Sequence, residues 1–389
     1  MPLHVISETR IPIYSWCAPI EKEALQQAYN VANLPVTFHH VAIMPDCHVG
    51  FGIPIGGVAA CVDAVIPNAV GVDIGCGVIA GKTDFPADDV GRKDLEEIVS
   101  KIKQRIPVGF DHRGSPQHWE GWATAPVHCA PVRAELDSAK YQLGTLGGGN
   151  HFIELQRDQN GLLWVMIHSG SRNFGLKIAE YYHQKAIRNC EKQKIKLPSR
   201  ELAFLELGTN DAQEYLDAMN FALRFASTNR EMMMREVNNV LSTIIHAEIT
   251  DIVQIHHNYC AKESHFGRDV LVHRKGATTA RKGERGIIPG SMGTNSYIVV
   301  GAGNEDSFHS CSHGAGRRMG RNEANRLLTP DMCKRAMKNV YFEWPTDRKG
   351  KPDLSEAPQA YKDIDEVMAS QQDLVKPLLK LSPLAVIKG

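Results

Sequence analysis

The sequence predicts one large α+β domain in which central β-sheets are flanked by helices. Segments with helical periodicity and short β-rich runs occur in the same chain. No internal repeat, low-complexity linker or clear domain boundary divides the 389 residues, and 43% of them are hydrophobic, which is enough to bury a substantial core. We therefore expect residues 1–389 to fold as a single domain.

Four segments have the residue pattern of helices. Residues 92–106 place four aliphatic side chains on one helix face, namely Leu95, Ile98, Ile102 and Ile106. Residues 20–33 and 176–195 also read as helices. Residues 210–249 keep a period close to 3.6, so we expect a long helical segment there with Met233 in the core.

Strands are predicted where short β-rich runs are bounded by polar residues or glycine. These runs are residues 164–168, 269–273 and 297–300. Residues 58–80 alternate small apolar residues with Gly and Pro, which predicts buried strands and tight turns. Residues 107–140 lack periodicity and are rich in Pro, Gly, His and Trp, so we expect an irregular surface insertion.

Composition narrows the classes of function. Lys plus Arg equals Asp plus Glu, at 44 each, so the chain as a whole is not a strongly charged nucleic-acid or membrane binder. No secretory signal is apparent, and no apolar run approaches the roughly 18 residues of a membrane helix. The nine scattered cysteines are typical of reduced thiols in a cytoplasmic protein, the location we expect.

The 17 histidines are the unusual feature, and several lie in short Gly-, Ser- or Asn-containing stretches. In G-V-D-I-G-C-G, residues 71–77, Asp73 and Cys76 offer an oxygen and a sulfur ligand on a flexible turn, and a thiolate can bridge two metal ions. The simpler reading is a tight turn between buried strands, with Cys76 as a small hydrophobic residue.

Histidines also occur in three further motifs. The glycines of L-G-G-G-N-H-F-I-E, residues 146–154, can cradle phosphate oxygens, although a plain turn fits equally well. His168 closes an apolar run before S-G-S-R and is either a ligand or a core histidine. In Q-I-H-H-N, residues 254–258, strand alternation lets only one of His256 and His257 face a given site.

Two Gly- and Ser-rich stretches follow. The amides and hydroxyls of G-I-I-P-G-S-M-G, residues 286–293, and of Ser296 suit an anion or a nucleotide. In C-S-H-G-A-G-R, residues 311–317, small neighbours leave His313 accessible, and Arg317 can neutralise a phosphate or form an exposed basic turn. Three histidines, one aspartate and one thiolate can together supply two metal ions that share the sulfur, with one histidine left for chemistry, and two-metal sites suit phosphoryl transfer.

Six motifs, in the order G-V-D-I-G-C-G, G-N-H-F, H-S-G-S-R, H-H-N, P-G-S-M-G and S-H-G-A-G-R, resemble those of the RtcB family of RNA ligases. They span residues 71–317, and residues 360–368 and 387–389 are also similar to the family, so the resemblance covers nearly the whole chain. It implies an RtcB-like α+β fold.

The resemblance implies an enzyme that joins RNA 3′-phosphate or 2′,3′-cyclic phosphate ends to 5′-hydroxyl ends, in tRNA splicing or RNA repair. Such enzymes use GTP and two Mn²⁺ ions. A histidine attacks the α-phosphate of GTP, the resulting histidine–GMP passes GMP to the RNA 3′-phosphate, and the 5′-hydroxyl then displaces GMP.

Matching motifs imply the roles of individual residues. His313 would be the catalytic nucleophile; Asp73, Cys76 and His151 would hold one Mn²⁺, and Cys76, His168 and His257 the other. The residues implied to contact the guanylate are Asn150, His151, Phe152, Ile153, Glu154, His257, Asn258, Pro289, Gly290, Ser291, Met292, Ser296, His313, Gly314, Ala315, Gly316 and Lys388, with Arg317 ending the same turn.

Some features depart from these expectations or leave alternatives open. A thiolate ligand by itself favours zinc over manganese, and the resemblance reverses that order. Cys47 stands where we expect an aliphatic residue. Its neighbours Asp46 and His48 match the family pattern and fit either a supporting role at the metal site or a structural role. The segment 107–125 is shorter and less basic than we expect for the family. The alternatives are a two-metal cyclic phosphodiesterase that does not ligate, and a non-catalytic RNA- or nucleotide-binding protein.

Overall fold

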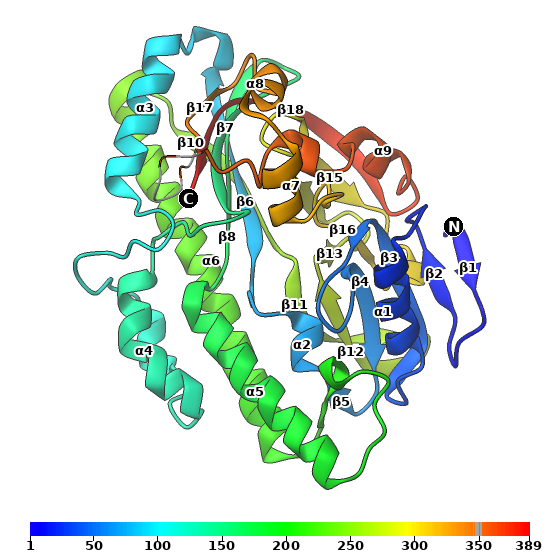
Figure 1. The fold of residues 1–389 in the computed structure, drawn as a ribbon. Helices are drawn as coiled ribbons and strands as arrows, with labels where there is room; N and C mark the ends of the chain where they lie inside the picture. The colour runs from blue at the N-terminus through cyan, green and yellow to red at the C-terminus, as the bar shows by residue number, and fades with distance from the viewer. Residues whose placement is uncertain (345, 347–349, 351) are drawn as a thin grey trace.

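A computed structural model describes every residue except 345, 347–349 and 351. Two large β-sheets form its frame, and helices cover their outer faces, which confirms the predicted α+β class (Figure 1). The first sheet has six strands, in the order β1 (His4–Ile6), β2 (Ile13–Ser15), β3 (Thr37–His48), β4 (Ile55–Cys61), β12 (Arg268–Lys275) and β11 (Asn258–His265).

The second sheet is larger and almost closes on itself. Its strands run in the order β10 (Ile249–His256), β6 (Gly77–Pro86), β8 (Leu162–Ser169), β7 (Phe152–Asp158), β18 (Val375–Lys388), β15 (Ser296–Gly301) and β14 (Arg285–Ile288), with β17 (Tyr341–Phe342) beside β18. The edge strands β10 and β14 contact each other, and Arg285 Nη2 of β14 donates to Asp251 Oδ1 of β10 at 3.0 Å.

Two short strand pairs complete the described sheets. They are β13 (Ala277–Thr279) with β16 (Ser310–Ser312), and β5 (Ala64–Val65) with β9 (Leu205–Glu206). This β13–β16 pair links the two large sheets. Along the chain, β13 is the next strand after β12 of the first sheet, and β16 is the next strand after β15 of the second. His313, the predicted nucleophile, is the first residue after β16.

The helices pack on the outer faces of the sheets. The α-helices are α1 (Lys22–Ala32), α2 (Pro67–Val70), α3 (Arg92–Arg105), α4 (Ala130–Gln142), α5 (Arg172–Lys192), α6 (Asn210–Ile245), α7 (Arg321–Leu327), α8 (Pro330–Ala336) and α9 (Ile364–Ala369). The 3₁₀ turns are η1 (Ala87–Asp89), η2 (Glu120–Thr124), η3 (Arg200–Leu202), η4 (Glu305–Ser307) and η5 (Pro358–Ala360). All four predicted helices and all three predicted β-rich runs are present, and none of the described helices is long and apolar enough to cross a membrane.

The long helix α6 packs against β6 and β8 on one side and against α3 and α5 on others (Figure 1). Thr209 caps its N-terminus by accepting from the amide of Ala212. Met233 is fully buried, as predicted. The helix ends at Ile245, four residues before the predicted boundary, because His246 takes a left-handed conformation with φ 56° and the chain turns into β10.

The prediction of an irregular insertion over residues 107–140 is wrong in its last part. Residues 130–142 form α4, which places Pro131 in its first turn and buries Val132 and Ala139 against the core. The Pro- and Trp-rich composition of residues 107–128 hides the better helix-forming sequence that follows. Trp119 packs on Phe221 of α6, so aromatic contacts anchor the earlier part of the segment.

Asn229 of α6 holds together the loops that lead into the histidine motifs. Its Oδ1 accepts from the amides of Gly144 and Thr145 at 2.7 and 3.1 Å, and its Nδ2 donates to the carbonyls of Thr145 and Gly170 and to Ser169 Oγ. The side chain is fully buried. One side-chain amide therefore forms hydrogen bonds with five polar groups of the surrounding loops.

Asn229→Ala should lower the free energy of unfolding by on the order of 3 kcal/mol, because several buried polar groups lose their partners. Urea denaturation followed by circular dichroism measures the change. Asn239→Ala is the matched control, because Asn239 is exposed on the same helix and its loss should change stability by less than about 0.5 kcal/mol. Equal effects of the two substitutions would show that the Asn229 hydrogen bonds are not a main support of the fold.

Candidate active site

The predicted site residues gather around one cavity of about 1010 Å³. Its walls come from both large sheets and from the segments around β16. The predicted residues that line it are Asp73, Cys76, Asn150, Phe152, Glu154, His168, His257, Asn258, Pro289, Gly290, Ser291, Met292, His313, Gly314, Ala315, Gly316, Arg317 and Lys388. Motifs spread over more than 300 residues of sequence thus meet in one place.

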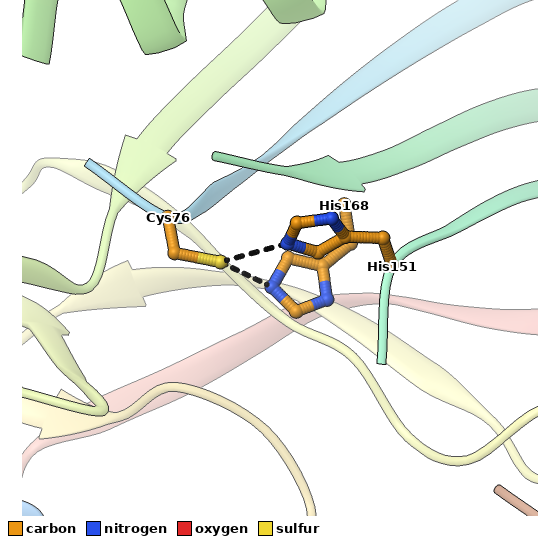
Figure 2. A group of neighbouring side chains, drawn as sticks. All are labelled: Cys76, His151 and His168. Carbon is orange, nitrogen blue, oxygen red and sulfur yellow. Dashed lines mark hydrogen bonds between the residues drawn. The ribbon is translucent and has the colours of Figure 1, made fainter. Parts of the chain in front are cut away.

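Cys76 is the centre of a buried cluster of metal-ligand atoms. Its Sγ lies 3.5 Å from His151 Nε2 and 3.1 Å from His168 Nε2, and Figure 2 shows the sulfur directed at one nitrogen of each ring. Asp73 Oδ2 lies 3.0 Å from His151 Nε2 on one side. His257 Nε2 lies 3.3 Å from His168 Nε2 on the other. The sulfur therefore stands between two sets of ligand atoms.

Backbone carbonyls fix the orientation of two of these rings. His151 Nδ1 donates to the carbonyl of Leu146 at 2.9 Å, and His168 Nδ1 donates to the carbonyl of Asn150 at 3.1 Å. Each ring proton is thereby placed on Nδ1, and each Nε2 presents a lone pair to the cluster. Both carbonyls belong to the Gly-rich stretch 146–154, so this loop orients ligands as well as lining the cavity.

The structure distinguishes His257 from His256. His257 follows β10, is 2% exposed and points into the cluster. His256 points the other way, where its Nδ1 lies 3.1 Å from the carbonyl of Gly75 and 3.2 Å from Arg230 Nη2. The motif position had indicated His257, and strand alternation explains why only one of the two reaches the cavity.

The electrostatics of the cluster suit a cation. Burial lowers the pKa of His168 and His257 well below the usual range, so these rings are neutral ligands. Burial, with the charge of Asp73, raises the pKa of the Cys76 thiol.

The donor set fits metal ions. The facing atoms of Asp73, His151 and His168 are acceptors, and only the thiol proton of Cys76 lies among them. Asp73 Oδ1 and His257 Nδ1 are, in addition, buried without a hydrogen-bond partner among the described residues. Close acceptors with so few protons repel one another unless positive charge lies between them, and divalent cations bind imidazole, thiolate and carboxylate.

His313 lies beside this cluster and is held by Asp46 at the end of β3. Its ring is 4.8 Å from that of His257, centroid to centroid. Asp46 Oδ2 accepts from His313 Nδ1 at 2.6 Å, from the amide of His313 at 2.9 Å and from the amide of Gly314 at 3.3 Å. The carboxylate thus fixes the proton on Nδ1 and leaves Nε2 as a free lone pair.

The turn after His313 is pressed closely against Asp46. Gly316 has φ +72°, and a Cβ there would lie 2.2 Å from the carbonyl oxygen of Asp46, so no larger residue fits. The amide of Ala315 donates to the carbonyl of Pro289 at 3.0 Å, which joins the S-H-G-A-G-R turn to the P-G-S-M-G loop. These two Gly-rich segments form one wall of the cavity.

Three predicted contacts do not line the cavity directly. The side chain of Ile153 packs in the core between β7 and the helices. Ser296 lies behind the P-G-S-M-G loop, where its Oγ accepts from the amide of Gly290 at 3.1 Å. His151 does not line the cavity, but its Nε2 lies next to Cys76 Sγ in the cluster. Asn258 does line the cavity, but its amide is used to bind the Asp73 carbonyl and the Gly276 amide at 3.1 and 2.9 Å.

A charged cluster that lines the cavity includes two residues that the motifs did not indicate, Glu356 and Arg321. Glu356 is 8% exposed and accepts from Arg317 Nη1 and Arg321 Nε, both at 3.0 Å, and lies 3.6 Å from Lys388 Nζ. Tyr361 also donates to it. Nothing in the surrounding S-E-A-P-Q sequence distinguishes this glutamate from a surface residue, so sequence reasoning missed it.

Cys47 is adjacent to Asp46, which binds His313. The Cys47 thiol is 1% exposed within the core of the first sheet, and the ammonium of Lys362 donates to the carbonyls of Pro45 and Cys47. Asp46 binds His313 directly, and His48 lines the cavity beside it.

Comparisons with known proteins identify the family of this chain. The family described as tRNA-splicing ligase RtcB matches residues 27–128 and 122–389. The chain is 40% identical to the RNA-splicing ligase RtcB of Escherichia coli K12 over 100% of both chains. It is 31% identical to the tRNA-splicing ligase RtcB of Methanococcus maripaludis over 95% of this chain and 92% of the relative, and 30% identical to the RNA-splicing ligase RtcB of Mycobacterium bovis over 93% and 100%. This chain, with its cysteine- and histidine-lined cavity, belongs to the RtcB family.

Proposed function

We propose that the protein is an RNA ligase that joins 3′-phosphate or 2′,3′-cyclic phosphate ends to 5′-hydroxyl ends through a histidine–GMP intermediate, with GTP and two Mn²⁺ ions as cofactors. The observation that supports this best is a free imidazole nitrogen, oriented by Asp46, beside a buried set of cation ligands in a nucleotide-sized cavity. Relatives named RNA-splicing and tRNA-splicing ligases add support.

In the first step, His313 Nε2 attacks the α-phosphorus of GTP. A phosphorus–nitrogen bond forms, the bond to the β-phosphate oxygen breaks, and pyrophosphate leaves. The ring can attack as a neutral nucleophile because Asp46 holds its only proton on Nδ1, on the far side from the cavity. The same hydrogen bond stabilises the positive charge that the ring acquires during attack.

Asp73, Cys76 and His151 would hold one Mn²⁺, and Cys76, His168 and His257 the other. Bound cations would neutralise phosphate charge and orient the reacting oxygens. The protein's own contribution is to keep Cys76 between the two sets of ligands and to hold His151 and His168 with their lone pairs facing inward. Manganese in place of zinc rests on the family resemblance and not on the donor types.

The part of the cavity around Glu154 suits a guanine base. Glu154 is 2% exposed and lines the cavity, and an ionised carboxylate there can accept from both N1–H and N2–H of guanine. Phe152 and Lys388 flank it, with the ammonium 5.5 Å from the ring centroid. The Pro289–Met292 loop and the Gly314–Gly316 turn line the cavity as well. The amides of Gly290, Ser291, Gly314 and Ala315 donate within the protein and hold these segments in shape, so contacts to ribose or phosphate fall to the other polar groups of the loop and turn.

In the later steps the RNA 3′-phosphate takes GMP from His313, and the 5′-hydroxyl displaces GMP to form the phosphodiester. Cationic side chains at the rim, including Arg318 and Arg321, can contact the RNA backbone. We propose that residues 1–389 act as one catalytic domain, since residues from both sheets supply the cavity.

His313→Ala should abolish covalent labelling by α-labelled GTP, a fall of at least about a thousand-fold, because the nucleophile is lost. The assay is incubation of the full chain with α-labelled GTP and MnCl₂ followed by denaturing electrophoresis. His112→Ala, an exposed histidine outside the cavity, should label normally. An unlabelled wild-type protein would favour the hydrolytic phosphodiesterase, and a labelled His313→Ala protein would exclude His313 as the nucleophile.

Cys76→Ala should reduce bound manganese at both positions and abolish labelling, because both sets of ligands lose their shared atom. Elemental analysis after equilibrium dialysis measures the metal content of the same samples. The matched control is Cys190→Ala, a buried cysteine on α5 that should leave metal content unchanged. Unchanged manganese in the Cys76 variant would contradict a bridging thiolate.

Glu154→Gln should reduce the preference for GTP over ATP by about 10- to 100-fold, because an amide cannot accept from both guanine donors. Burial raises the pKa of Glu154 to about 7, so the carboxylate form predominates only above that pH. The wild-type preference should accordingly weaken as the pH falls below about 7, while the variant should show no such decline. Labelling with α-labelled GTP against unlabelled ATP, across pH, measures both effects.

A further inference from the structure

A second cluster of metal-ligand side chains lies away from the cavity, at one end of the first sheet. It consists of His265, Glu305 and His309, which we call the outer histidine cluster. His265 is the last residue of β11, Glu305 begins η4, and His309 immediately precedes β16. None of the three lines the cavity.

The ligand atoms of the outer histidine cluster are close together. His265 Nδ1 lies 3.4 Å from Glu305 Oε2, and His309 Nε2 lies 2.9 Å from Glu305 Oε1. One ligand atom from each residue lies within 4.8 Å of the others. Neighbouring ligand atoms around a tetrahedral zinc ion are about 3.3 Å apart, given zinc–ligand bonds of about 2.0–2.1 Å. Small side-chain rotations are enough to bring all three onto one ion.

A buried carboxylate orients His265 toward this point. His265 Nε2 lies 3.0 Å from Glu263 Oε2, and the His265 side chain is 1% exposed. Glu263 is in turn fixed by Arg274, whose Nη2 donates to the same oxygen at 3.1 Å. A histidine that donates one ring N–H to a carboxylate and offers the other nitrogen as a lone pair is the usual arrangement at zinc sites.

The other two ligands are accessible to solvent. The side chain of Glu305 is 56% exposed and that of His309 is 23% exposed, so an ion can enter and keep a water molecule as its fourth ligand. The backbone nonetheless holds His309 firmly. Phe308 and His309 both have left-handed φ values, 51° and 50°, and their carbonyls accept from Arg274 Nη2 at 2.8 Å and from the amide of Ala280 at 2.7 Å.

We infer that His265, Glu305 and His309 bind a zinc ion at a site separate from the Cys76 cluster. Two imidazoles and one carboxylate favour zinc strongly over manganese. The site has a structural consequence for the nucleophile, because three residues of β16 connect His309 to His313. An ion on His309 holds the beginning of this strand while Asp46 holds its end.

The test uses Cys76→Ala as the background, so that zinc at the cavity cluster does not obscure the outer site. This protein should bind one zinc ion per chain by elemental analysis after dialysis. Glu305→Gln or His309→Gln added to it should remove that ion or weaken binding by at least about tenfold. Asp306→Asn is the matched control, since Asp306 is the neighbouring carboxylate and contacts His40 only through its carbonyl.

A second measurement separates metal binding from a loss of folding. Zinc should raise the melting temperature of the Cys76→Ala protein by mass action, and it should not raise that of the Glu305→Gln double variant. Circular dichroism without zinc should show both proteins folded. Retention of the zinc ion and of the thermal shift in the double variants would overturn the inference and leave Glu305 as an ion-pair partner of two protonated imidazoles.

Discussion

The site depends on five side chains of the kinds that bind cations, which lie close together in a largely buried pocket. Asp73, His151, Cys76, His168 and His257 form an almost continuous row in which each separation is about 3 Å, and most of the facing atoms are acceptors. In a medium of low polarity such an arrangement is unfavourable until positive charge enters it. The surrounding hydrogen bonds must therefore hold the row together before any ion binds.

Two side chains in the middle of α6 supply several of those hydrogen bonds. Arg230 is fully buried, and its Nη1 donates to the carbonyls of Gly75 and Ser169, both at 2.9 Å, on either side of Cys76 and His168. Burial lowers the pKa of Arg230 to about 10, which leaves it charged at neutral pH. This positive charge lies behind the ligands, where it offsets the negative charge of Asp73 without occupying the place of an ion. Asn229, one residue earlier, binds the adjoining loops.

Periodicity predicts the main helices and several strands, because a 3.6-residue stripe such as that in 92–106 is a local signature. The five residues of the row were expected from the ordered family motifs, since the glycines around Asp73 and Cys76 by themselves fit a simple tight turn better. Glu356 has no such signature, because its importance comes from Arg317, Arg321 and Lys388, which reach it from two segments distant in sequence. The strand β18, which carries Lys388, was missed for the same reason, since its pairing with β7 and β15 joins residues over 70 positions apart.

The position of the nucleophile also follows from contacts that no single motif contains. β16 has only three residues, and it pairs with β13 through Ala277 opposite Ser312. The amide of Ala277 in turn donates to the carbonyl of His257 at 3.2 Å, so the strand that carries His313 is hydrogen-bonded to a strand that begins at the ligand cluster. These hydrogen bonds link the backbone of His257 to that of Ser312, the residue before His313, through two short strands. A strand of only three residues depends on contacts at both of its ends for its position. Asp46 provides the restraint at His313, and the Glu305–His309 contact provides it at the other end.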